Sequence, residues 1–97
     1  MSVVKINAIH VLSDVAEEFE RQFIGSLRMI EDFEGFESFD LLRPVKGDDR
    51  YFVMSRWATE ENYLHWIEQN PGKSHDKSGR RLATKSELLE FETCPLT

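Results

Sequence analysis

Three side chains of this sequence have chemical types that suit a cofactor site: His75, Asn7 and Trp66. His75 lies in a polar segment, PGKSHDKSGRR, and a neutral imidazole is a common ligand of haem iron. Asn7 interrupts the otherwise apolar strand pattern VVKINAIHV, where asparagine is disfavoured and its amide needs hydrogen-bond partners. Trp66 lies on an expected helix shortly before His75. Together these residues predict a haem site.

Each of the three residues also has a purely structural explanation. A histidine in a polar loop is most often solvated, an asparagine in a strand can hydrogen-bond to a loop, and a tryptophan at helical spacing is usually core. In the functional interpretation His75 binds the iron, Asn7 donates a hydrogen bond to iron-bound oxygen, and Trp66 presses on the macrocycle. A positive patch near His75 would suit the haem propionates. Five of the twelve Lys and Arg residues lie within residues 73–85: Lys73, Lys77, Arg80, Arg81 and Lys85.

The other candidate residues carry weaker signals. Phe23 is either plain core or a second aromatic wall. His10 lies on the opposite face of its strand from Asn7, and His65 is expected to point away from the site. The spacing of the three histidines fits no zinc motif, and the sequence has no Gly-rich phosphate loop and no GxSxG elbow. Hydrolase and nucleotide-binding functions therefore have no support.

Composition narrows the class of protein. A chain of 97 residues is long enough for one domain, residues 1–97. The net charge of −6 argues against nucleic acid as a partner, because phosphate binding requires a basic surface. Cys94 is the only cysteine, so no disulfide can form within the chain. No signal peptide and no apolar run of membrane-spanning length are evident, so we expect a cytoplasmic protein that is not associated with a membrane.

Hydrophobic spacing predicts six elements in the order β-α-β-β-α-β. The expected strands are 3–11, 36–43, 50–57 and 88–93, and the expected helices run from 14 to about 30 and over 60–69. Asp14 and Glu17 have the spacing of a capping box, Thr59 is expected to cap the second helix, and Gly47 supplies a turn. The segment 73–86 is expected to be a loop. This order predicts an α+β, ferredoxin-like fold.

The sheet of such a fold has helices on one face only. The chain has no further elements with which to cover the other face. We therefore expect a homodimer in which two sheets pack into an α+β barrel.

In the order and spacing of its short sequence motifs, the chain resembles the antibiotic-biosynthesis-monooxygenase-like dimeric α+β barrels. Within them it is similar to the haem-degrading monooxygenases of the IsdG/MhuD type, most of all to the mycobacterial member. The resemblance extends from Val3 to about Glu92. It rests on VVKINAI, GF, LLRPVKG, RYFV with Trp57, Trp66 with His75, and LLEFE.

The resemblance implies a homodimer with haem held between the helices and the sheet in each subunit. His75 would be the axial iron ligand, Asn7 the distal hydrogen-bond donor, Trp66 the residue that ruffles the haem, and Phe23 part of the distal pocket. Haem would be both cofactor and substrate. Dioxygen and an external electron donor, such as a reductase, would open the porphyrin ring and release iron.

One stretch departs from the family pattern. The most similar members carry basic residues on the first helix near the propionates, whereas this chain has Gln22 and Ser26, with Arg21 and Arg28 nearby. The residues that contact the propionates are therefore expected to differ.

Three alternative functions stay open. One is a cofactor-free monooxygenase of quinol-like or anthrone-like aromatics, which shares the fold. The second is a haem-binding or storage protein without turnover. The third, supported only by analogy of fold, is a dimeric interaction domain.

Overall fold

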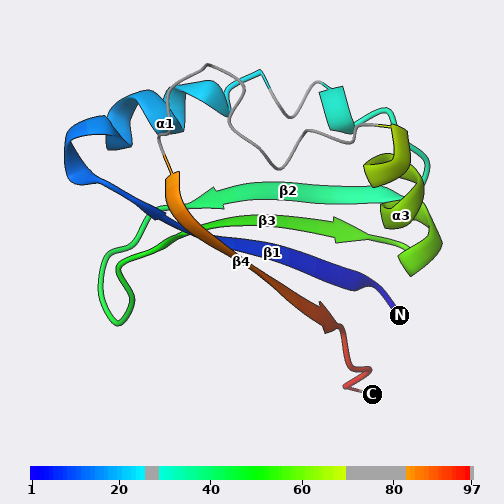
Figure 1. Ribbon diagram of the computed structural model, residues 1–97. Coiled ribbons are helices and arrows are strands. Elements are labelled where there is room, and N and C mark those ends of the chain that lie inside the picture. Colours follow the sequence, from blue (N-terminus) through cyan, green and yellow to red (C-terminus); the bar gives the residue numbers. More distant parts are fainter. Residues whose placement is uncertain (26–28, 70–82, 97) are drawn as a thin grey trace.

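The computed structural model describes residues 1–25, 29–69 and 83–96 of the chain. The elements are β1 (Val3–Val11), a 3-10 helix (Ser13–Val15), α1 (Ala16–Gln22), β2 (Phe36–Leu42), β3 (Tyr51–Trp57), α3 (Glu60–Gln69) and β4 (Ala83–Glu92). The four strands form one antiparallel sheet in the order β2-β3-β1-β4. Both labelled helices lie on the same side of the sheet, α1 over one end and α3 at the other (Figure 1). The predicted ferredoxin-like α+β fold is thereby confirmed.

Alternation along the strands decides which side chains face the helices. On β3, Tyr51, Val53, Ser55 and Trp57 are buried, while the residues between them are more exposed. Successive side chains of a strand point to opposite faces, so the buried set shares the helix-facing side. The pairing of Asn7 with Val53 places Asn7 on the same side.

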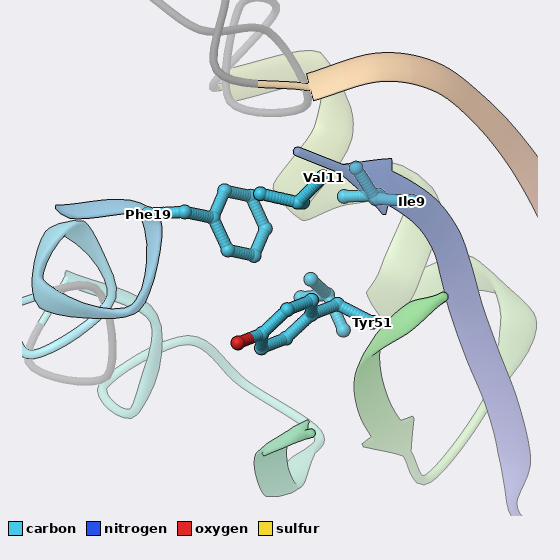
Figure 2. Close-up of a cluster of buried hydrophobic side chains, with 5 residues drawn as sticks. Ile9, Val11, Phe19 and Tyr51 are labelled. Atoms are coloured by element: carbon cyan, nitrogen blue, oxygen red, sulfur yellow. The ribbon is translucent and has the colours of Figure 1, made fainter. Parts of the chain in front are cut away.

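The core beneath the helices consists of two clusters. The first joins α1 to the sheet and contains Ile9, Val11, Phe19, Tyr51 and Val53. Figure 2 shows the Phe19 ring directed from α1 toward Val11 and Tyr51 of the sheet. Its ring centroid lies 5.1 Å from that of Tyr51 in an edge-to-face arrangement.

The second cluster lies at the α3 end of the sheet. It contains Ile30, Trp57 and Tyr63, with Trp66 among the partly buried residues packed against it. Trp57 is fully buried, and its ring contacts the rings of Phe36 and Tyr63. The separation of the core into two clusters leaves room between them for a cavity.

Two local features, the Thr59 cap and the Gly47 turn, confirm the sequence analysis. Thr59 caps α3, because its Oγ1 accepts a hydrogen bond from the Asn62 main-chain N–H at 3.1 Å. Gly35 and Gly47 both adopt positive φ, as the connections before β2 and before β3 require. A side chain at position 35 would also meet Asn62 on α3, since a Cβ built there lies 2.1 Å from the Asn62 side chain.

The first helix differs from its prediction at both ends. No side-chain cap forms at the start of the 3-10 helix or of α1, so the Asp14–Glu17 capping box was wrong. A 3-10 turn occupies the position where the box was expected, and it satisfies the Val15 N–H with the Leu12 carbonyl instead. The α-helix ends at Gln22 although the apolar stripe continues to Ile30. Glycine at position 25 lowers helix propensity by about 1 kcal/mol relative to alanine and favours the turn found there.

The last strand is longer than predicted. β4 begins at Ala83, within the segment expected to be a loop, and pairs with β1 from Val11 to Val3. A register shift between His10 and Val11 marks a bulge in this pairing. The polar residues at its start gave no strand signal, and backbone pairing with β1 overrides that local preference.

The sheet face away from the helices is rich in apolar side chains. Strand alternation places these residues on it: Val4, Ile6, Ala8, Leu42, Phe52, Met54, Leu89 and Phe91. No labelled helix lies over this face (Figure 1). Separately, none of the helices within the described ranges is long and apolar enough to cross a membrane.

Candidate functional site

A cavity of about 330 Å³ lies between the two core clusters, with the helix-facing side of the sheet as its floor. Strands β1 and β3 contribute Lys5, Asn7 and Ser55 to its lining. Phe23, which follows α1, and Trp66 of α3 line it as well. This size is at the lower end of the range of about 300–1,000 Å³ that is typical of small-molecule sites. Mostly apolar walls with a few polar groups are the usual composition of such a site.

The structure brings together three of the four residues that the sequence singled out. Asn7, Phe23 and Trp66, which come from distant parts of the chain, all line this one cavity. His75 belongs to residues 70–82, which lie outside the described part of the chain. His10 lies on the other face of the sheet from Asn7, as expected from strand alternation.

Asn7 lines the floor of the cavity from strand β1. It pairs with Val53 of β3 and Leu88 of β4, so apolar side chains flank it on both sides. Among the described residues, no hydrogen-bond partner is found for its side-chain amide. A half-buried amide without a partner gains free energy when a ligand or a water supplies one. Asn7 is therefore available to act on whatever occupies the cavity.

Trp66 is held by other aromatic rings. Its ring centroid lies 5.7 Å from that of Trp57 and 6.3 Å from that of Tyr63. Because Trp57 is fully buried in the core, this contact fixes Trp66 against a rigid base. Phe23 is also held by aromatic contacts, with its centroid 5.0 Å from Phe19 and 6.3 Å from Phe39. Trp66 and Phe23 are thus both held in place by contacts with other aromatic rings of the core.

A buried lysine closes one end of the cavity. The Lys5 ammonium lies 2.6 Å from a carboxylate oxygen of Glu60 on α3 and 2.6 Å from one of Glu90 on β4. It also lies 4.8 Å from the centre of the Tyr63 ring, within the range of a cation–π contact. Burial lowers the pKa of Lys5, but the two carboxylates outweigh burial and raise it overall. Lys5 is therefore a fixed positive charge that joins α3 to the edge of the sheet.

The sequence analysis did not select Lys5, Ser55 and Tyr63, although all three line the cavity. Each of the three has a definite position in the chain relative to another lining residue. Lys5 and Asn7 alternate on one strand face, Ser55 stands opposite Lys5 in the register, and Tyr63 precedes Trp66 by one helical turn. These relations become informative only after the strand register and the orientation of α3 are known.

Comparison with known proteins identifies close relatives. A family model described as antibiotic biosynthesis monooxygenase matches residues 2–71. A protein of Mycobacterium tuberculosis named heme oxygenase (mycobilin-producing) is 42% identical over 95 residues, which cover 95% of this chain and 89% of that relative.

Solved structures of similar fold include two kinds of oxygenase. The heme-degrader MhuD from Mycobacterium tuberculosis, with two hemes bound in its active site, matches with a TM-score of 0.80 at 39% identity over 98% of each chain. SnoaB, a cofactor-independent oxygenase from Streptomyces nogalater, matches with a TM-score of 0.75 at 26% identity, over 99% of this chain and 95% of that one.

Proposed function

Because this chain is an enzyme that belongs to the antibiotic biosynthesis monooxygenase family, we propose that it is a haem-degrading monooxygenase with haem bound in the cavity between helices and sheet. The observation that carries the proposal is the convergence of Asn7, Phe23 and Trp66 on that cavity. The 42% identical relative, which is named a heme oxygenase, supports the same substrate.

The residues around the cavity suit a large, flat and mostly apolar ligand. Phe23 and Trp66 offer aromatic walls, and Val53 and Leu88 contribute aliphatic surface on the floor. Among the described lining residues, Asn7 has a side-chain amide for which no hydrogen-bond partner is found. Mostly apolar walls with a few well-placed polar groups suit a macrocycle with a reactive centre.

Haem, when bound, supplies the iron centre at which dioxygen is activated, with electrons from an external donor such as a reductase. The protein supplies position and polarity. His75 is proposed to bind the iron from the segment that follows α3. Asn7 would offer its side-chain amide N–H to an oxygen group of the bound ligand. Trp66 would contact the macrocycle from α3, and such a contact is one way in which a protein changes haem reactivity.

We further propose a homodimer formed through the apolar sheet face that the helices leave uncovered. In this face Ile6 pairs with Met54 and Leu89, so apolar side chains are contiguous across three strands. A contiguous exposed apolar area of this kind marks an interaction site. The same face of a second chain would bury this apolar area in a symmetric interface.

The test of the substrate is a haemin titration followed by ascorbate in air, recorded as visible spectra. We expect a saturable shift of the Soret band, then decay of that band with release of iron. A stable Soret band would indicate a haem carrier without turnover. Absence of any shift would reject haem as the substrate.

The axial ligand is tested with a matched pair of histidine variants. His75→Ala is expected to abolish turnover and to weaken haem binding strongly. His65→Ala is the control, because His65 is exposed on α3 next to Trp66 and has the same chemical type. Normal turnover by His75→Ala, or loss of binding only in His65→Ala, would contradict the assignment.

A second candidate function is supported by the likeness to SnoaB, which is described as a cofactor-independent oxygenase. The aromatic walls of the cavity would also suit a planar quinol-like or anthrone-like substrate. Oxidation of such a compound by haem-free protein, together with no Soret shift on addition of haemin, would favour this function.

A further inference from the structure

Ser55 is a buried polar residue on the floor of the cavity. It is 7% exposed, and it lines the cavity from the centre of β3. Within residues 1–25, 29–69 and 83–96, no hydrogen bond is found for its hydroxyl group. A hydroxyl group that lines a cavity and has no protein partner is free to donate to, and accept from, a molecule inside that cavity.

The sheet register relates Ser55 to Asn7. Lys5 is paired with Ser55, and Asn7 with Val53, so Ser55 and Asn7 are diagonal neighbours on the same face of adjacent strands. Diagonal neighbours lie about 7–8 Å apart. No direct hydrogen bond between the two side chains is found among the described residues, and one water molecule can bridge polar groups at such a separation.

We infer that Ser55 and Asn7 together hold one water molecule on the cavity floor, and that Ser55 is thereby a positioning residue for Asn7. A side-chain amide has an accepting oxygen and a donating NH2 group, and an amide without partners can present either. A water that donates to the Asn7 oxygen and accepts from the Ser55 hydroxyl turns the NH2 group toward the ligand. Insofar as it concerns haem, this inference rests on the proposed function.

Neighbouring polar groups do not take over this role. The Lys5 ammonium, which is paired with Ser55 across the strands, is already engaged by Glu60 and Glu90. Ser86 also lines the cavity, but it is exposed, so bulk water can satisfy its hydroxyl. Only Ser55 combines deep burial with a diagonal position next to Asn7 among the described serines.

The first test uses the protein without any ligand. A high-resolution crystal structure is expected to show a water within about 3.2 Å of both the Ser55 Oγ and the Asn7 side-chain amide. In Ser55→Ala that water should be lost. A Ser55 hydroxyl that bonds to a main-chain carbonyl instead, or an unchanged water in Ser55→Ala, would overturn the inference.

The second test measures fluoride affinity of the ferric haem complex, because bound fluoride accepts hydrogen bonds from nearby donors. Ser55→Ala should weaken fluoride binding about two- to tenfold, the effect of one neutral hydrogen bond. Ser55→Thr keeps the hydroxyl and should restore the affinity. Ser38→Ala, on the opposite sheet face, controls for the loss of a serine hydroxyl from the sheet.

A double-mutant cycle shows whether Ser55 acts through Asn7. In an Asn7→Ala background, Ser55→Ala should change fluoride affinity less than twofold. An equal loss in both backgrounds, or no loss in either, would overturn the inference. Failure of the wild-type protein to bind haem would reject the proposed function alone, because the water in the ligand-free crystal is tested separately.

Discussion

At the scale of single residues, the neighbours of a polar group decide whether it is available for chemistry. Lys5 is buried and fully engaged by two carboxylates, so it holds structure together. Asn7 lines the same cavity with an amide that none of the described residues engages. The difference between the two follows from their neighbours, since Lys5 lies opposite Glu90 and Asn7 lies opposite Leu88.

The first prediction concerns Asn7→Ala. The variant should bind haem within a few-fold of the wild-type affinity, because the proposed iron ligand and the aromatic walls remain. Turnover should fall at least tenfold, since the proposed hydrogen-bond donor to the reacting oxygen is lost; a factor of ten corresponds to about 1.4 kcal/mol. Soret titration and iron release under ascorbate measure the two quantities separately. Turnover at the wild-type rate would remove Asn7 from the mechanism.

The sequence was informative about residues whose type is unusual for their place. An asparagine in an apolar strand and a tryptophan before a lone histidine were visible without coordinates, and Asn7 and Trp66 do line one cavity. Ser55 and Tyr63 could not be found in this way, because serine and tyrosine are unremarkable in a strand and on a helix. Their relevance depends on register and on helix orientation, which are tertiary properties.

At the scale of elements, one acidic side chain fastens α1 to the sheet. Glu20 accepts two hydrogen bonds from the Arg43 guanidinium, at 2.8 and 2.5 Å, and a third from the Tyr51 hydroxyl. The hydrogen bonds from Arg43, and next the one from Tyr51, lower the pKa of Glu20 to about 2. This attachment holds α1 against the sheet, and with it Phe23, which lines the cavity.

The second prediction concerns the variant Glu20→Gln, whose loss of stability relative to wild type should depend on pH. A carboxylate whose pKa is lower in the folded state stabilises above its ordinary pKa of 4.5 and loses this effect as pH falls toward about 2. The variant should therefore melt several degrees below wild type at pH 7, and the gap should close toward pH 2. Glu17→Gln, an exposed residue on the same helix, is the control. If the difference in melting temperature between wild type and Glu20→Gln did not change with pH, the ionised Glu20 carboxylate would not be the source of the stabilisation.

The third prediction concerns Lys5→Met, which removes the cation between α3 and β4. Since Glu60 and Glu90 are about half exposed and can be hydrated when the lysine is gone, we expect a loss of about 1–3 kcal/mol rather than the larger cost of a fully buried pair. For a small domain each kcal/mol lowers the Tm by about 4–8 °C. Lys46→Met, in an exposed turn, should leave the Tm unchanged.

The pH dependence of this third effect follows from the raised pKa of Lys5. A cation whose pKa is higher in the folded state stabilises fully below its ordinary pKa of 10.5, and the effect is lost as pH rises through the raised value. The difference in Tm between wild type and Lys5→Met should therefore be constant near neutral pH and shrink only in strong alkali. A difference that disappears between pH 6 and 8 would assign the stabilisation to another group.

The boundaries of elements show where local sequence is a sufficient guide. The 60–69 helix was predicted correctly because Thr59, the apolar spacing and the Asn-Pro-Gly that follows all agree. The start of β4 was not predicted correctly. Residues 83–86 form a strand because they pair with β1, and their own composition does not favour a strand. The α-helix likewise stops at Gln22 while its apolar stripe continues.

At the scale of the whole molecule, the two faces of the sheet differ in what covers them. The helix-facing side holds the core and the cavity. The opposite side is also apolar, and no element labelled in Figure 1 lies over it. Antiparallel sheets with one solvated face normally alternate apolar and polar residues, and β1 departs from that pattern with Val4, Ile6 and Ala8. The proposed second copy of the chain would account for this departure.

The last prediction tests that assembly with two substitutions of equal exposure. Phe91 is 54% exposed on the uncovered sheet face, and Leu64 is 51% exposed on α3. Wild type and Leu64→Lys should both show twice the 11.4 kDa chain mass by light scattering at micromolar concentration. Phe91→Lys should shift to monomer, because a symmetric interface would bury the new charge twice, and each 1.4 kcal/mol weakens association tenfold. A monomeric wild type, or a dimer that survives Phe91→Lys but not Leu64→Lys, would show that this face is not the interface.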